Sequence, residues 1–212
     1  MMDYDLFYCI GDSFVHAVDQ SDDLQRTVTH NNRFTGLISS HYGLREVNKG
    51  LSGASNEYIF RTIYNDMLEY KRNGINPFVL VLYTDHNRKE IWSSKNNIPY
   101  TLGEYIASKA FIKEWYSEHF NDTYNKHMSD AIESAIKFML TSYGIDYLDG
   151  HSLTPDKNIK YNTHLDMPVG DFCAPDRFPL TDKNDFDGHP TVQGHKRIAK
   201  WIIDKIDSLY NT

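Results

Sequence analysis

Short apolar runs that end in turn residues alternate along the chain with longer segments in which apolar residues recur every three or four positions. The first run, Leu6–Ile10, stops at Gly11 and is typical of a buried parallel strand. A similar run covers 78–83, and weaker ones cover 45–48 and 145–148. We therefore predict four strands of a parallel sheet.

Helical spacing separates these runs. One amphipathic segment begins near Asn56, with Ser55 or Asn56 as its cap, a second covers about 122–143, and a third lies around 198–206. Strands that alternate with helices predict an α/β protein with helices on both faces of a parallel sheet. The prediction is one three-layer α/β/α domain over residues 1–212, with a flavodoxin-like strand order.

Composition and charge exclude several classes of protein. With 212 residues, 40% of them hydrophobic and 24% charged, the chain has the composition of one globular domain. A formal net charge of −7 argues against nucleic acid as a partner. No apolar run approaches the roughly 20 residues of a membrane helix, so we expect no membrane partner. The acidic start does not resemble a secretory signal, which predicts a cytoplasmic or virion-associated protein.

Ligands of an open parallel sheet bind beyond the carboxyl ends of its strands, so the residues that follow each strand are the ones to inspect. Ser13, in the turn Gly11-Asp12-Ser13-Phe14, follows the first strand and begins a predicted helix. Backbone N–H groups at such a turn favour negative charge. Ser13 is a candidate nucleophile, and the structural alternative is that it only caps the helix.

Two other turns carry candidate chemistry. His189 closely follows Asp185 and Asp187, and a histidine oriented by a carboxylate can activate a serine, although a solvated turn gives the same pattern. The loop at 48–56 contains Gly53, whose N–H can be aimed at a developing oxyanion or can simply serve a tight turn.

Together these three turns resemble the blocks of the SGNH hydrolases, also called GDSL-type esterases, over nearly the whole chain. The resemblance implies a Ser-His-Asp triad in which Ser13 is the nucleophile and His189 the base, with Asp187 orienting His189. It also implies an oxyanion hole formed by the N–H groups of Ser13 and Gly53, and no metal or organic cofactor.

Two features depart from the family pattern. After the strand at 78–83 the family has Gly-x-Asn-Asp, whose Asn donates to the oxyanion, and here Asn87 is out of register. We take Asn87 as the candidate donor, with Thr84, His86 and Arg88 as alternatives. The family's Asp precedes its His by three positions. Asp187 is one residue too close by that rule, and Asp185 is one too far.

Other clusters favour ordinary structural roles. His151, His164 and Cys173 fall in a polar, irregular segment without the tight spacing of a zinc site, so we expect surface residues there and no bound metal. Cys9 and Cys173 are expected to be free thiols, with Cys9 in the core. Tyr83 is one of several tyrosines that either line a sugar-binding cleft or pack in the core.

The sequence therefore predicts a serine esterase. A polar segment stands at about 150–187 where a lipase would present apolar surface, which favours short acyl groups, acetyl above all, on a carbohydrate or another polar alcohol. An O-acyltransferase on the same fold and a non-catalytic carbohydrate-binding or assembly module are the alternatives.

Overall fold

The computed structural model describes residues 3–17, 28–92, 99–102, 121–152, 163–173 and 189–210. In chain order its elements are β1 Leu6–Ile10, α1 Ser13–His16, α2 Phe34–Tyr42, β2 Arg45–Asn48, α3 Asn56–Asn73, β3 Pro77–Tyr83, β4 Lys89–Trp92, β5 Pro99–Leu102, α5 Asp122–Tyr143, β6 Tyr147–His151, α6 Val169–Phe172 and α7 Val192–Tyr210.

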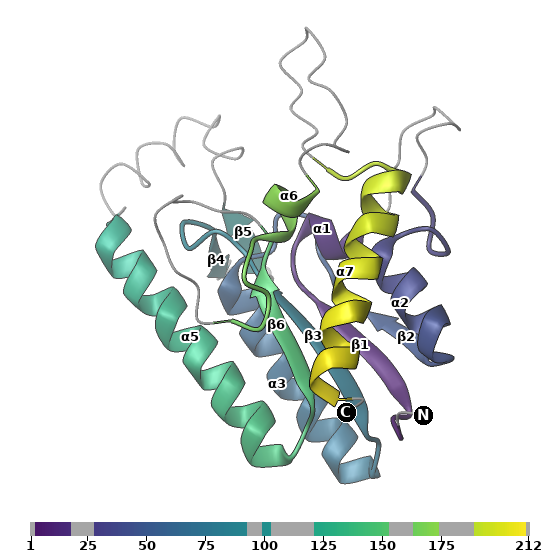
Figure 1. Ribbon diagram of the computed structural model, residues 1–212. Helices are drawn as coiled ribbons and strands as arrows, with labels where there is room; N and C mark the ends of the chain where they lie inside the picture. The colour runs from purple at the N-terminus through teal and green to yellow at the C-terminus, as the bar shows by residue number, and fades with distance from the viewer. Residues whose placement is uncertain are drawn as a thin grey trace, which may run out of the picture.

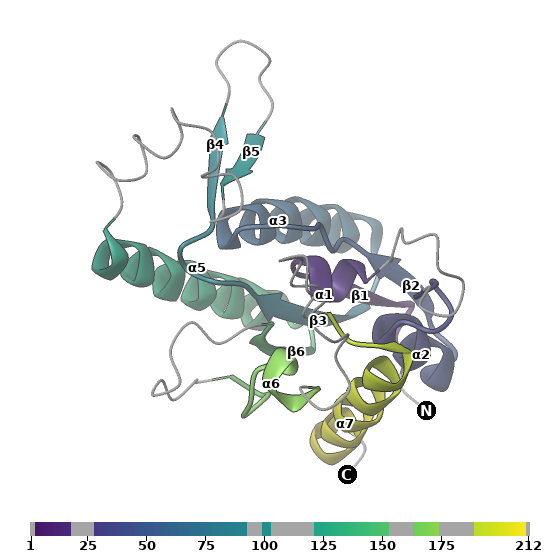
Figure 2. The same ribbon diagram turned by 90° about the horizontal axis from the view of Figure 1, so that it is seen from above.

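A parallel sheet with the strand order β2-β1-β3-β6 forms the middle layer (Figure 1). Seen from above, α3 and α5 cover one face of this sheet, while α2 and α7 cover the other (Figure 2). The predicted three-layer α/β/α fold is confirmed, and the strand order is the flavodoxin-like one.

Each face of the sheet has its own apolar core. Residues of β1 and β3 alternate between the two cores, because successive side chains of a strand point to opposite faces. Phe7 and Leu80 belong to the core under α2 and α7, whereas Tyr8 and Val81 belong to the core under α3 and α5. Burial on both faces explains why these strands are continuous apolar runs in the sequence.

The predicted elements agree with the structure except near their ends. The strand expected at 145–148 is Tyr147–His151, because Ile145 still closes α5 by donating its N–H to Leu140 O at 3.0 Å. Gly144, with φ 68°, provides the left-handed turn that this helix end requires. Helix α2 and the antiparallel pair β4–β5, which stands apart from the sheet in Figure 2, were not predicted.

The topology brings several turns to one edge of the molecule. Strands β1 and β3 are neighbours and parallel, so the turn that begins with Gly11 and the turn that begins with Thr84 lie side by side beyond the carboxyl edge of the sheet. Within the described ranges, the structure contains no helix of the length and apolar character needed to cross a membrane.

Candidate active site

Asp12 organises the turn that follows β1. Its side chain is buried, and its Oδ1 accepts a hydrogen bond from the N–H of Phe14 at 3.0 Å, so Asp12 is the N-cap of α1. Ser13 is therefore not the cap, which removes the structural alternative for this residue. Among the residues that the structure describes, none hydrogen-bonds to the Ser13 hydroxyl or accepts a hydrogen bond from the Ser13 N–H. No described residue therefore occupies either group.

The loop between β2 and α3 lies against this turn. The N–H of Leu51 donates to Gly11 O at 3.1 Å, and Nδ1 of His16 lies 3.1 Å from Gly50 O. A Cβ atom at Gly50 would come within 2.3 Å of the backbone nitrogen of His16, so only glycine permits this approach. Glycine at position 50 therefore allows the loop to pack against α1.

Gly53 is the left-handed residue of the same loop. Its φ is +75°, and a Cβ atom at this position would have no atom within 4 Å, so the residue borders open space. Its N–H has no acceptor in the part of the chain that the structure describes. Gly53 thus presents a backbone donor in the loop that packs against the turn containing Ser13, and a donor of this kind could bond an oxyanion.

His189 comes from the opposite end of the chain and contacts the turn that contains Ser13 through Phe14. Its imidazole ring contacts the ring of Phe14, the residue after Ser13, with a centroid distance of 5.4 Å and an interplanar angle of 42°. Thr191 follows, and its hydroxyl accepts a hydrogen bond from Gly194 N at 3.2 Å in the first turn of α7. His189 thus lies two residues before the residue that caps the first turn of α7.

A second histidine, His195, lies in the first turn of α7. His195 is buried and stacks on Phe34 at a centroid distance of 5.7 Å, and its Nδ1 accepts a hydrogen bond from the Phe34 N–H. Burial, together with the charges of His189 and Arg33, lowers the pKa of His195 to about 4. His195 is therefore neutral near pH 7 and adds no positive charge beside His189.

Asn56 fixes the turn after β3, a role that the sequence did not reveal. Its side-chain amide donates to Thr84 O at 3.1 Å and accepts from Thr84 N at 2.9 Å, and it also donates to Ser129 Oγ at 2.7 Å. The helix cap at this point is Ser55, whose hydroxyl accepts from Tyr58 N. An amide that pairs with both backbone groups of one residue extends the strand pairing by one step beyond β3.

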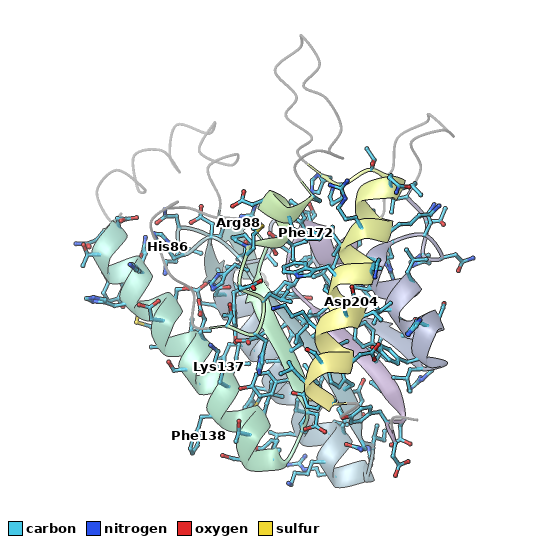
Figure 3. All side chains as sticks on the ribbon, viewed as in Figure 1. His86, Arg88, Lys137, Phe138, Phe172 and Asp204 are labelled. Carbon is cyan, nitrogen blue, oxygen red and sulfur yellow. The ribbon has the colours of Figure 1, made fainter. Side chains whose placement is uncertain are left out.

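The four side chains proposed as the third donor bond to two carboxylates, those of Asp12 and Asp122. Thr84 Oγ1 donates to Asp12 Oδ2 at 3.0 Å, and Arg88 Nη1 donates to the same oxygen at 2.9 Å. His86 Nε2 lies 2.8 Å from Oδ1 of Asp122, which is the first residue of α5. The Asn87 side chain also hydrogen-bonds to Asp122. Figure 3 shows His86 near the start of α5 and Arg88 nearer the middle of the sheet edge.

The carboxylates proposed to orient His189 fall outside the described residues. Asp185 and Asp187 both belong to the range 174–188, so the choice between them stays a prediction.

The irregular segment contains two buried residues where the sequence predicted surface positions, and that prediction was wrong for both. His151 is the last residue of β6, and its Nε2 lies 3.6 Å from Oε2 of Glu133 in α5. Cys173 packs in the core under α7. Burial lowers the pKa of His151 to about 4. Neither Cys9 nor Cys173 forms a disulfide within the described residues, and Cys9 lies in the core as expected.

Tyr83 and the other candidate ligands likewise have structural partners. The Tyr83 ring is buried in the core under α3 and α5, so this residue does not line a cleft. His164 Nδ1 lies 2.6 Å from Oδ1 of the buried Asp149. The other carboxylate oxygen of Asp149, Oδ2, lies 3.1 Å from Nζ of Lys137. Over the described ranges, no group of three or more His, Cys, Asp or Glu side chains is arranged to hold a metal ion.

Comparison with known proteins supports the fold. No protein-family model matches the sequence, and no curated protein matches it. The crystal structure of TesA aligns with 96% of this chain and 99% of its own, with a TM-score of 0.54 and 14% identity.

Two further solved structures align less closely. A lipolytic protein G-D-S-L family member from Veillonella parvula has a TM-score of 0.38 and 11% identity, over 97% of each chain. The acetylxylan esterase Axe2 from Geobacillus stearothermophilus, solved as a catalytic mutant, has a TM-score of 0.39 and 15% identity, over 95% of this chain and 94% of its own.

At these identities a structural likeness shows the fold alone. The likeness to TesA over nearly the whole chain confirms the fold that the resemblance to SGNH hydrolases predicted.

Proposed function

We propose that the protein is a serine-dependent ester hydrolase that removes short acyl groups, acetyl above all, from a carbohydrate or another polar alcohol. The observation that carries this proposal is the contact of the His189 ring with Phe14, the residue after Ser13, at the carboxyl edge of the sheet. The Ser13 turn and the residue before α7 are far apart in the sequence, and His189 contacts the residue next to Ser13.

The proposed reaction proceeds through an acyl-serine. Ser13 Oγ attacks the ester carbonyl while His189 accepts the hydroxyl proton, and the C=O π electrons move to the carbonyl oxygen. When the C–O bond breaks, His189 returns this proton to the leaving alcohol. Water then attacks the acyl-serine, again with His189 as base, and releases the carboxylic acid and free Ser13. Asp187 is proposed to orient the His189 ring and stabilise its cationic form.

The oxyanion is held by hydrogen-bond donors that the described residues leave unused. The N–H groups of Ser13 and Gly53 have no acceptor among those residues, and both belong to turns that are fixed by hydrogen bonds. Donors of this kind stabilise negative charge without first having to reorganise. Asn87 is the third donor expected from the sequence.

A fluorophosphonate probe tests the nucleophile directly. Such a probe forms a covalent adduct with an activated serine, so the intact mass of the protein should rise by one adduct, and peptide mapping should locate it on Ser13. The His189→Ala variant should react far more slowly, because the hydroxyl then has no base. A wild-type protein that remains unlabelled, or an adduct on another residue, would refute the proposal.

A further inference from the structure

We propose that the guanidinium group of Arg88 is the third donor to the oxyanion, beside the N–H groups of Ser13 and Gly53. This inference rests on the proposed ester hydrolase function, because it assigns a role in the same reaction. It replaces Asn87 by a residue whose side chain is connected directly to the nucleophile turn.

The first argument concerns the donors that are already engaged. Thr84 uses its hydroxyl proton on Asp12 Oδ2. His86 and Asn87 both direct their side chains to Asp122, at the start of α5. To bond the substrate, the Thr84 hydroxyl and Nε2 of His86 would each have to give up a contact. The Asn87 amide has a second N–H, but its hydrogen bond to Asp122 ties it to the start of α5 and not to the turn of Asp12.

The Arg88 guanidinium group has N–H donors that no described residue uses. A guanidinium group carries five N–H bonds in a planar fork, and one of its terminal nitrogens, Nη1, bonds to Asp12. In the described part of the chain, the guanidinium group makes no other hydrogen bond or ion pair. The side chain is 22% exposed, so its remaining N–H groups can reach a bound molecule.

The position of Arg88 follows from Asp12. One oxygen of this carboxylate accepts from the N–H of Phe14, and the other accepts from Arg88 and from Thr84. Because a single carboxylate joins all three donors, the guanidinium group lies within a few ångström of the turn that contains Ser13. Asp12 is completely buried, and this holds its ion pair with Arg88 in one geometry.

The charge of Arg88 suits the same role. Negative charge develops on the substrate carbonyl oxygen in the transition state, and a fixed cation beside Ser13 stabilises that charge more than the neutral ground state. A guanidinium group also stays protonated throughout the working pH range, so the donor is present whenever His189 is neutral and able to act as base.

The experiment must separate this role from a structural one, because Arg88 is also the counter-ion of Asp12. We would compare Arg88→Ala with Asn87→Ala, measuring kcat and KM with p-nitrophenyl acetate, and thermal unfolding as the check on folding. We expect Arg88→Ala to lower kcat roughly 100-fold with little change in KM. Asn87→Ala should lower kcat less than Arg88→Ala does.

Chemical rescue distinguishes a role of Arg88 in catalysis from a purely structural role. Guanidinium chloride, at concentrations far below those that unfold proteins, should restore part of the lost kcat of Arg88→Ala. Sodium chloride at the same ionic strength should not. An Arg88→Ala protein that folds but shows no rescue, or an Asn87→Ala protein with the larger loss of kcat, would overturn the proposal.

A double variant covers the case in which Arg88→Ala does not fold. Asp12→Asn combined with Arg88→Gln removes both charges of the buried pair, and asparagine preserves the N-cap. Its kcat should lie well below that of Asp12→Asn alone, and equal values would overturn the assignment.

The wild-type protein is labelled with the fluorophosphonate probe in parallel. If the wild type is unlabelled and inactive, the ester hydrolase proposal fails. If it is labelled and active while the Arg88 variants retain their kcat, only the role of Arg88 fails.

Discussion

The imidazole ring of His189 packs on the phenyl ring of Phe14, with 5.4 Å between the ring centroids. The contact joins the turn after the first strand to the residues just before the last helix. In a doubly wound sheet this is the edge where ligands bind. The contact therefore places the candidate base against the residue that follows the candidate nucleophile.

The first prediction concerns Ser13. Ser13→Ala should lower the hydrolysis of p-nitrophenyl acetate roughly 10⁴-fold or more, because the acyl-serine cannot form. Ser52→Ala is the matched control, since Ser52 is an exposed serine of the neighbouring loop and should keep its activity. Near-normal turnover by a folded Ser13→Ala protein would show that the nucleophile has been misassigned.

The second prediction concerns the acyl chain. The segment from about 150 to 187 is polar in sequence, so we expect the rate to fall from acetyl to octanoyl along a series of p-nitrophenyl esters. The measurement is kcat/KM for each ester, with and without detergent micelles. Rates that rise with chain length, or strong activation by micelles, would contradict a preference for short acyl groups.

The third prediction concerns Gly53. Gly53→Ala should lower kcat, because alanine disfavours the φ of +75° that aims this N–H. Gly74→Ala is a matched control, because Gly74 has a φ of +66° and a Cβ atom added there would also have no atom within 4 Å. Gly74 is the C-cap of α3, at the opposite end of the helix from the Gly53 loop. Both substitutions should cost about 1–2 kcal/mol of unfolding free energy.

Only Gly53→Ala should affect catalysis in this comparison. Equal losses of kcat in the two variants would show that general destabilisation, rather than a misplaced N–H group, explains the effect.

The fourth prediction concerns the partner of His189. Asp187→Asn should lower kcat more than Asp185→Asn, with little change in KM, because an orienting carboxylate acts on the imidazole and not on substrate binding. The glycine at position 188 tolerates backbone angles that would let the Asp187 carboxylate reach the ring. The two variants are compared after thermal unfolding has shown that both fold. A larger loss for Asp185→Asn would exchange the two roles.

The sheet and its long helices were predictable because the pattern that encodes them is local. The run Leu6–Ile10 is a strand with the same bounds, and the amphipathic segment 122–143 is α5 with the same bounds. The later strand was misplaced because Ile145, although apolar, takes part in the Schellman turn that ends α5. Periodicity alone does not distinguish a buried turn residue from a strand residue.

The contacts that define the site were less accessible from sequence. Arg88 and Asp12 are 76 positions apart, and an arginine in a turn gives no sign of a buried carboxylate partner. Asn56 resembles a helix cap by sequence, yet it pairs with the backbone of Thr84. Such contacts depend on how β1, β3 and α3 meet in three dimensions, and a single sequence contains no direct signal for them.

The last prediction concerns Glu133, a residue of α5 whose carboxylate faces His151 of β6 and whose side chain is 15% exposed. Burial raises its pKa to about 7, and the charges of Asp130 and Asp149 act in the same direction, while Lys137 opposes them. The unfolded chain has an ordinary Glu pKa, so between about pH 4.5 and pH 7 the folded protein binds more protons than the unfolded chain. The contribution of Glu133 to stability is therefore greatest below about pH 4.5 and is lost as the pH rises to about 7.

The loss amounts to about 3 to 4 kcal/mol at most, since the pKa rises from 4.5 to about 7 and each pKa unit corresponds to roughly 1.4 kcal/mol. Glu133→Gln removes this titration while it retains the shape of the side chain. We expect the variant to gain stability relative to the wild-type protein as the pH is raised from about 4.5 to about 8, measured by urea unfolding across that range. Glu69→Gln, on exposed surface of α3, is the control and should show no such trend. A difference between Glu133→Gln and wild type that stays constant with pH would show that folding does not raise the pKa of Glu133.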